Sequence, residues 1–180
     1  MKRTLLVAAL AATAALTPTT PAMSKDAPDE TVAQARAATA RFHDVDRAVE
    51  AGYVQASPCE EGQGYHYVNF ALAGNDALDV ATPEVLLYEP QKNGRLRLVG
   101  VEYVRFLPTF TAPATPPYVR DPNGPSMFGV DFHGPMAGHF DGPLPGTIDD
   151  MPDHHELHVW VWRHSPEGMF EAHNSRITCP

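Results

Sequence analysis

Apolar residues recur at steps of three and four between about Glu30 and Gly52. They form a single stripe on a helix, which consists of Val32, Ala35, Ala38, Phe42, Val45 and Val49. Gly52 is typical of the residue that ends a helix. The pattern predicts a helical segment over about 30–52, as one helix or as two with a break near Asp44. We expect this segment to pack across a sheet and to have a structural role.

After Cys59 the chain changes to strand-like patterns, rich in aromatic and β-branched residues, which predict strands over 65–72, 83–89, 95–106 and 156–163. Asn93-Gly94 is a strong turn signal, so the second and third strands should form a hairpin. Residues 107–153 are dominated by Pro, Gly and Asp. A helix followed by antiparallel strands indicates an α+β fold, with the helix packed on a sheet that forms a small barrel or sandwich with long Pro/Gly-rich loops.

Alternate residues of a strand share a face, and this alternation selects three ionisable residues in apolar surroundings. His66 shares its face with Val68 and Phe70, and Glu102 shares its face with Val104 and Phe106. The corresponding face of the last strand carries His158, Trp160 and Trp162. The last strand should be covered on both sides, because its other face is also apolar.

A buried carboxylate is costly unless it pairs, takes up a proton or binds a metal ion. Two imidazoles and one carboxylate are a common ligand set for zinc, iron or manganese, so His66, Glu102 and His158 are candidate metal ligands. In a metal-free alternative, Glu102 is a general acid or base with a raised pKa, oriented by either histidine. In a purely structural alternative, Glu102 pairs with an arginine such as Arg97, and the histidines are satisfied core residues.

The remaining histidines lie mostly near the irregular region. His139 or His154 could complete a site with three or four ligands, whereas four others are expected at the surface, namely His133, His155, His164 and His173. The HHELH segment that begins at His154 does not match the metalloprotease pattern, because the order of residues differs and the segment is strand-like. Methionines near these histidines keep copper among the candidate ions.

The first residues have the layout of a secretory signal peptide, with Lys2 and Arg3 before an apolar run over 4–16. The run is too short to cross a bilayer as a helix. Cleavage after Ala22 would leave a single globular domain over 23–180, with a β-rich part from about residue 62. An earlier cleavage near Ala14 or an uncleaved anchor is the alternative. We therefore expect a secreted or periplasmic protein that has no membrane contact after cleavage.

The chain has two cysteines, Cys59 and Cys179, both beyond the expected signal peptide. An even number in an exported protein predicts a disulfide, and the alternatives are free thiols or a thiolate metal site. The separation does not match the short spacings of zinc ligands.

The chain is acidic, with 13 Lys and Arg residues against 22 Asp and Glu residues and a formal net charge of −9. All the acidic residues follow the expected signal peptide, so the mature domain is more acidic still. Such a surface repels phosphate backbones, which argues against nucleic acid as a partner. A metal ion or a small molecule is the expected partner.

Five segments, GQGYHYVNFAL, PEVLLYE, GRLRLVGVEYV, LHVWVW and NSRITC, resemble in their order a family of uncharacterised secreted proteins. The resemblance runs from about residue 36 to residue 179. It implies secretion but no activity, because the family has none established. The sequence therefore predicts an exported domain with a His/Glu-lined pocket that binds a divalent metal ion, for structure, storage or catalysis. The alternatives are a metal-free binder or enzyme that uses Glu102, and an interaction module without a site.

Overall fold

The helical region folds as two helices with a break, as the second of the two sequence interpretations expects. The computed structural model describes residues 28–107, 118–138 and 151–180. Helix α1 (Pro28–Thr39) continues into the 3-10 helix η1 (Ala40–His43), and α2 (Val45–Glu50) follows. Asp44 between them has an extended backbone, and its side chain accepts a hydrogen bond from the Asp46 N–H at 3.2 Å, which caps α2.

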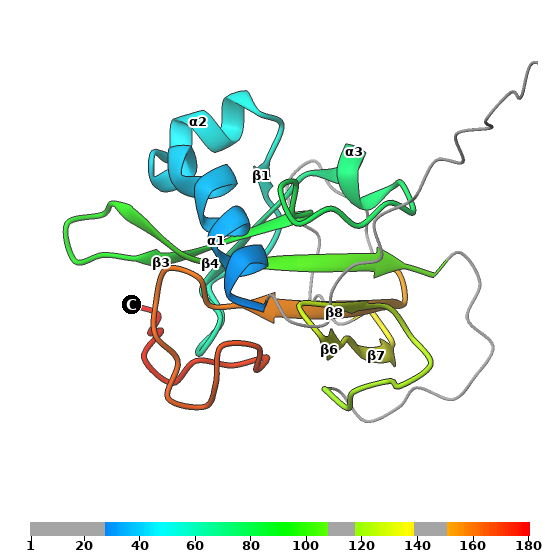
Figure 1. The fold of residues 1–180 in the computed structure, drawn as a ribbon. Helices are drawn as coiled ribbons and strands as arrows, with labels where there is room; N and C mark the ends of the chain where they lie inside the picture. The colour runs from blue at the N-terminus through cyan, green and yellow to red at the C-terminus, as the bar shows by residue number, and fades with distance from the viewer. Residues whose placement is uncertain (1–27, 108–117, 139–150) are drawn as a thin grey trace, which may run out of the picture.

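The strands form one antiparallel six-stranded sheet in the order β1-β2-β3-β4-β8-β7 (Figure 1). Its members are β1 (Val54–Gln55), β2 (Tyr65–Val68), β3 (Val85–Pro90), β4 (Leu96–Phe106), β7 (His133–Met136) and β8 (His154–Val159). A two-stranded sheet of β5 (Ser126–Met127) and β6 (Val130–Asp131) lies apart from it. The α+β class is confirmed. The six-stranded sheet is open at β1 and β7 in the part of the chain that the structure describes, so the predicted barrel or sandwich is not confirmed.

The predicted hairpin at Asn93-Gly94 is present and joins β3 to β4. Gly94 has a φ of 77°, and the Gln91 N–H donates to the Arg95 carbonyl at 2.8 Å to close the turn. The antiparallel pairing then continues to β8, where Glu102 lies directly opposite His158. The pairing of β4 with β8 therefore fixes the position of Glu102 relative to His158.

The two faces of the sheet are covered by different parts of the chain. The helices pack on one face, where Phe42 and Ala35 join a cluster with Leu86, Val101 and Leu157. The other face carries a second cluster that includes Val85, Leu87, Trp160 and, from the C-terminal tail, Ile177. The ionisable residues selected by the sequence lie on this second face, away from α1, η1 and α2.

Two strands are shorter than predicted. β2 ends at Val68 because the Asn69 side chain accepts from the Ala71 N–H at 3.1 Å and begins the short helix α3 (Phe70–Ala73). β8 ends at Val159, because the Trp160 N–H donates to Met169 rather than to a strand partner. Trp160 still stacks on His158, but the Trp162 indole donates to Thr39 in α1 at 3.2 Å. The expectation that Trp162 shares a face with His158 is therefore wrong.

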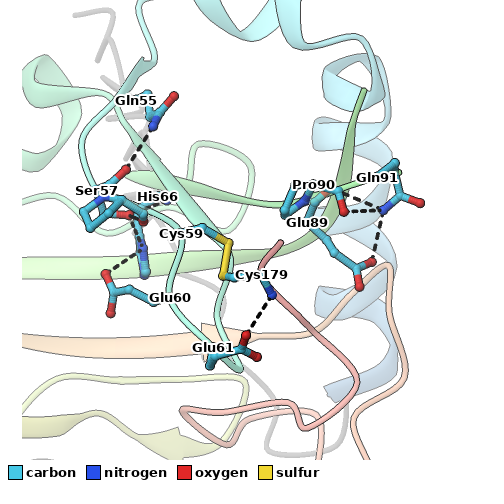
Figure 2. The surroundings of a disulfide bond; sticks show 11 residues. Gln55, Ser57, Cys59, Glu60, Glu61, His66, Glu89, Pro90, Gln91 and Cys179 are labelled. Carbon is cyan, nitrogen blue, oxygen red and sulfur yellow. Dashed lines mark hydrogen bonds and ion pairs between the residues drawn. A yellow bond between two sulfur atoms is a disulfide. The ribbon is translucent and has the colours of Figure 1, made fainter. Parts of the chain in front are cut away.

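The disulfide between Cys59 and Cys179 is present and spans 120 residues. It joins the loop between β1 and β2 to the C-terminal tail (Figure 2). None of the helices in the described ranges has the length and apolarity needed to cross a membrane. The expected signal peptide lies outside the described residues.

Candidate metal centre

Three strands bring His66, Glu102 and His158 together on the face of the sheet opposite α1, η1 and α2. His158 is the direct cross-strand partner of Glu102, and His66 reaches the pair from β2 across β3. The Glu102 Oε2 atom lies 3.6 Å from the His66 Nε2 atom and 3.9 Å from the His158 Nε2 atom. All three side chains are buried, with 7%, 2% and 1% of their surface exposed for His66, Glu102 and His158.

These distances suit a metal ion. One ligand atom from each residue lies within 4.8 Å of the other two. Zinc bonds of about 2.0–2.2 Å in a tetrahedral arrangement place ligand atoms roughly 3.3–3.6 Å apart. The two contacts of Glu102 are at this separation or a few tenths of an ångström beyond it, so small side-chain rotations would bring all three residues to an ion.

The outward-facing nitrogen of each histidine meets an oxygen. The His158 Nδ1 atom lies 3.3 Å from the Glu156 Oε1 atom. The His66 Nδ1 atom lies 3.0 Å from the Ser57 hydroxyl and 3.7 Å from the Glu60 Oε1 atom (Figure 2). Histidines that bind metals usually donate their second N–H to a carboxylate or another oxygen, which leaves the first nitrogen free to coordinate. The second nitrogen of His66 has such a contact, whereas the His158 Nδ1 atom lies near Glu156 without a hydrogen bond to any described residue.

Glu156 belongs to the cluster but is absent from the candidate residues chosen from the sequence. It is 2% exposed, and it lies opposite Val104, one step along the same face from Glu102. Burial favours a raised pKa for Glu156, but His158 and His154 together lower that pKa well below its usual value. Strand alternation places Glu156 on the same face as His154 and His158, and that pattern could have selected it.

The charge of Glu102 is opposed by its surroundings. Burial raises the pKa of Glu102 well above its usual value, and the neighbouring Glu156 raises it further. The Glu102 Oε2 and His158 Nε2 atoms have no hydrogen-bond partner among the described residues. A proton on Glu102 relieves the repulsion when no cation is bound, and a divalent cation at the same point would replace that proton.

His154 supports the cluster from outside. Its Nδ1 atom faces the Pro152 carbonyl at 2.9 Å, and its Nε2 atom faces Glu156 at 3.2 Å. With both ring nitrogens directed at these oxygens, His154 is not part of the three-residue group that could hold an ion. His139, the other proposed addition, lies outside the described residues.

Two of the four histidines expected at the surface are buried. His133 in β7 is 2% exposed, and burial followed by the nearby Arg120 lowers its pKa to about 4. His155 is 8% exposed and pairs with Asp121 at 3.0 Å. His164 and His173 are exposed as predicted.

The structural alternative, in which Glu102 pairs with an arginine such as Arg97, is not supported for Arg97. Arg97 forms its ion pair with Glu89, at the hairpin end of β3 and β4. In the described ranges, the basic groups at ion-pair distance from Glu102 are those of His66 and His158. No lysine or arginine of the described residues therefore balances the carboxyl group of Glu102.

No family model matches the chain, and neither a curated protein nor a solved structure matches it. The resemblance to a family of secreted proteins therefore stays a prediction. What can be inferred about function rests on the geometry of the His66, Glu102 and His158 cluster.

Proposed function

We propose that this protein binds a divalent transition-metal ion through His66, Glu102 and His158. The observation that supports the proposal is the convergence of the two Nε2 atoms on one carboxylate oxygen, 3.6 and 3.9 Å away, while each Nδ1 atom faces another oxygen. Two neutral imidazoles and an ionised carboxylate would direct three lone pairs at one point, which is unfavourable without a cation or a proton between them.

The donor set narrows the choice of ion. Two imidazole nitrogens and one carboxylate oxygen suit zinc, iron(II) or manganese, whereas copper in oxidising compartments more often takes methionine or thiolate ligands as well. Three protein ligands leave at least one coordination position for water or a substrate oxygen. An ion held in this way would act as a Lewis acid that activates the bound water, and structural or storage roles are the simpler alternatives.

We place this activity outside the cytoplasm. The Cys59–Cys179 disulfide supports an oxidising compartment, because cytoplasmic thiols are kept reduced. The expected signal peptide over 1–22 points to the same location.

Calorimetric titration of the metal-free protein with Zn²⁺, Mn²⁺ and anaerobic Fe²⁺ tests the proposal. We expect one tight site for at least one ion, and its loss in His158→Ala and in Glu102→Gln. His164→Ala is the matched control, because His164 is exposed and lies outside the cluster. Equal affinity in wild type and both cluster variants, each with a native circular dichroism spectrum, would overturn the proposal.

The raised pKa of Glu102 favours one second candidate, a metal-free acid/base site for a small organic molecule. Treatment with a chelator separates the two candidates. Ligand binding or catalysis that survives complete metal removal would favour the metal-free site.

A further inference from the structure

Ser57 lies in the loop before β2, is fully buried, and makes three polar contacts through one hydroxyl group. Its Oγ atom lies 2.7 Å from the Pro58 carbonyl oxygen, 3.0 Å from the backbone nitrogen of His66, and 3.0 Å from the Nδ1 atom of the His66 ring. Figure 2 shows Ser57 and Glu60 both directed at the same nitrogen of the His66 ring, Nδ1.

The donors and acceptors of these contacts can be assigned from their chemistry. A hydroxyl group has one hydrogen to donate and two lone pairs to accept with. The Pro58 carbonyl can only accept, so it takes the hydroxyl hydrogen. The backbone N–H of His66 can only donate, so it occupies one lone pair of the Ser57 oxygen.

The remaining lone pair of Ser57 faces the His66 Nδ1 atom, and the contact is a hydrogen bond only if Nδ1 carries a hydrogen. A neutral imidazole with its hydrogen on Nδ1 has its lone pair on Nε2. That Nε2 atom is the one that lies 3.6 Å from Glu102. The Glu60 carboxylate, 3.7 Å from Nδ1, favours the same assignment.

We propose that Ser57 is a positioning residue that fixes the tautomer and the ring orientation of His66, so that Nε2 is available to a metal ion. The role rests on the proposed metal-binding function. Ser57 does not touch the ion in this account and acts through His66 alone.

The loop that carries Ser57 is held at several points, which explains why one hydroxyl can keep its place. Cys59 is bonded to Cys179 in the C-terminal tail. The Gly64 N–H donates to the Glu60 carbonyl at 2.7 Å, and the Asn174 N–H donates to the Gly62 carbonyl at 2.9 Å. These contacts join the loop to itself and to the tail, so His66 meets a preorganised acceptor.

Loss of an outer hydrogen-bond partner of a metal ligand typically lowers metal affinity by about 10- to 100-fold. We expect a decrease in this range for Ser57→Ala, measured by competition with a chromogenic zinc chelator. Ser165→Ala is the matched control, because Ser165 is also buried but donates to Glu167 in the tail. Its affinity for zinc should stay within about twofold of wild type.

Long-range proton–nitrogen correlation spectra of the metal-free protein test the assignment directly. In wild type at neutral pH, the His66 hydrogen should be on Nδ1, and in Ser57→Ala a form with the hydrogen on Nε2 should appear. A merely structural role for Ser57 would not change the tautomer. If the variant fails to fold, the wild-type spectrum is a sufficient test. A His66 hydrogen mainly on Nε2 in wild type would overturn the inference.

The outcomes separate this inference from the proposed function. If wild type binds no metal but has its His66 hydrogen on Nδ1, the metal proposal falls and the tautomer assignment stands. If wild type binds zinc and Ser57→Ala changes neither affinity nor tautomer, the role of Ser57 falls and the metal site stands.

Discussion

Removal of the Cys59–Cys179 disulfide should cost much of the stability of this domain. In the chain-entropy model, a bond that closes a loop of 120 residues lowers the entropy of the unfolded chain enough to contribute about 5 kcal/mol at 25 °C. The native contacts around the bond do not depend on it, because the Gly62 N–H donates to Ile177 at 3.2 Å and the Cys179 N–H donates to Glu61 at 3.1 Å. The double variant Cys59→Ala/Cys179→Ala should therefore fold with the same structure and unfold more easily.

Urea denaturation followed by circular dichroism measures the effect. We expect the free energy of unfolding to fall by about 4–5 kcal/mol, and the melting temperature to fall by roughly 10–20 °C for a domain of this size. A dithiol reductant should bring wild type to the stability of the variant and leave the variant unchanged. A loss below about 1 kcal/mol, with equal urea dependence in both proteins, would refute the entropic reasoning.

Two further predictions concern buried positions away from the three proposed ligands. Burial raises the pKa of Glu84 from its usual value of about 4.5 to about 7. The folded protein therefore holds this proton more tightly than the unfolded chain, and stability falls as the pH rises from about 4.5 to about 7, by up to roughly 3 kcal/mol. Urea titrations at pH 4 and pH 8 should show a loss of stability that is smaller in Glu84→Gln than in wild type by up to this amount, because Glu102 still contributes in both proteins. Equal losses in the two proteins would contradict the prediction. Gly64→Ala should destabilise by more than about 2 kcal/mol in urea denaturation, because Gly64 has a φ of 86° and a Cβ atom would collide with the Tyr88 carbonyl. A stable variant would contradict that geometry.

Strand alternation was sufficient to select His66, Glu102 and His158. In β2 and β4 a single ionisable residue interrupts an apolar face, and in β8 His158 shares its face with the apolar Trp160. These patterns depend only on the two-residue period of a strand. The helical segment and the β3–β4 hairpin were predictable for similar reasons, since Gly52 and Asn93-Gly94 act through local backbone preferences.

Strand alternation could also have selected Glu156, but its position next to Glu102 follows from the register that places it opposite Val104. The other supporting residues could not be selected in this way, because their roles depend on contacts between distant parts of the chain. His133 is buried because its Pro- and Gly-rich segment pairs with β8. Trp162 does not lie on the expected face, because β8 ends before the apolar pattern of the sequence ends. The strand ends where the Trp160 N–H donates to the Met169 carbonyl.

The most direct test of the metal site is elemental analysis of the mature protein, purified from an oxidising compartment without an affinity tag or chelator. We predict close to one equivalent of zinc, iron or manganese in wild type and in His164→Ala, and its loss in folded His158→Ala. A protein that carries no divalent transition metal, and takes none up at neutral pH, would contradict the assignment of His66, Glu102 and His158 as ligands.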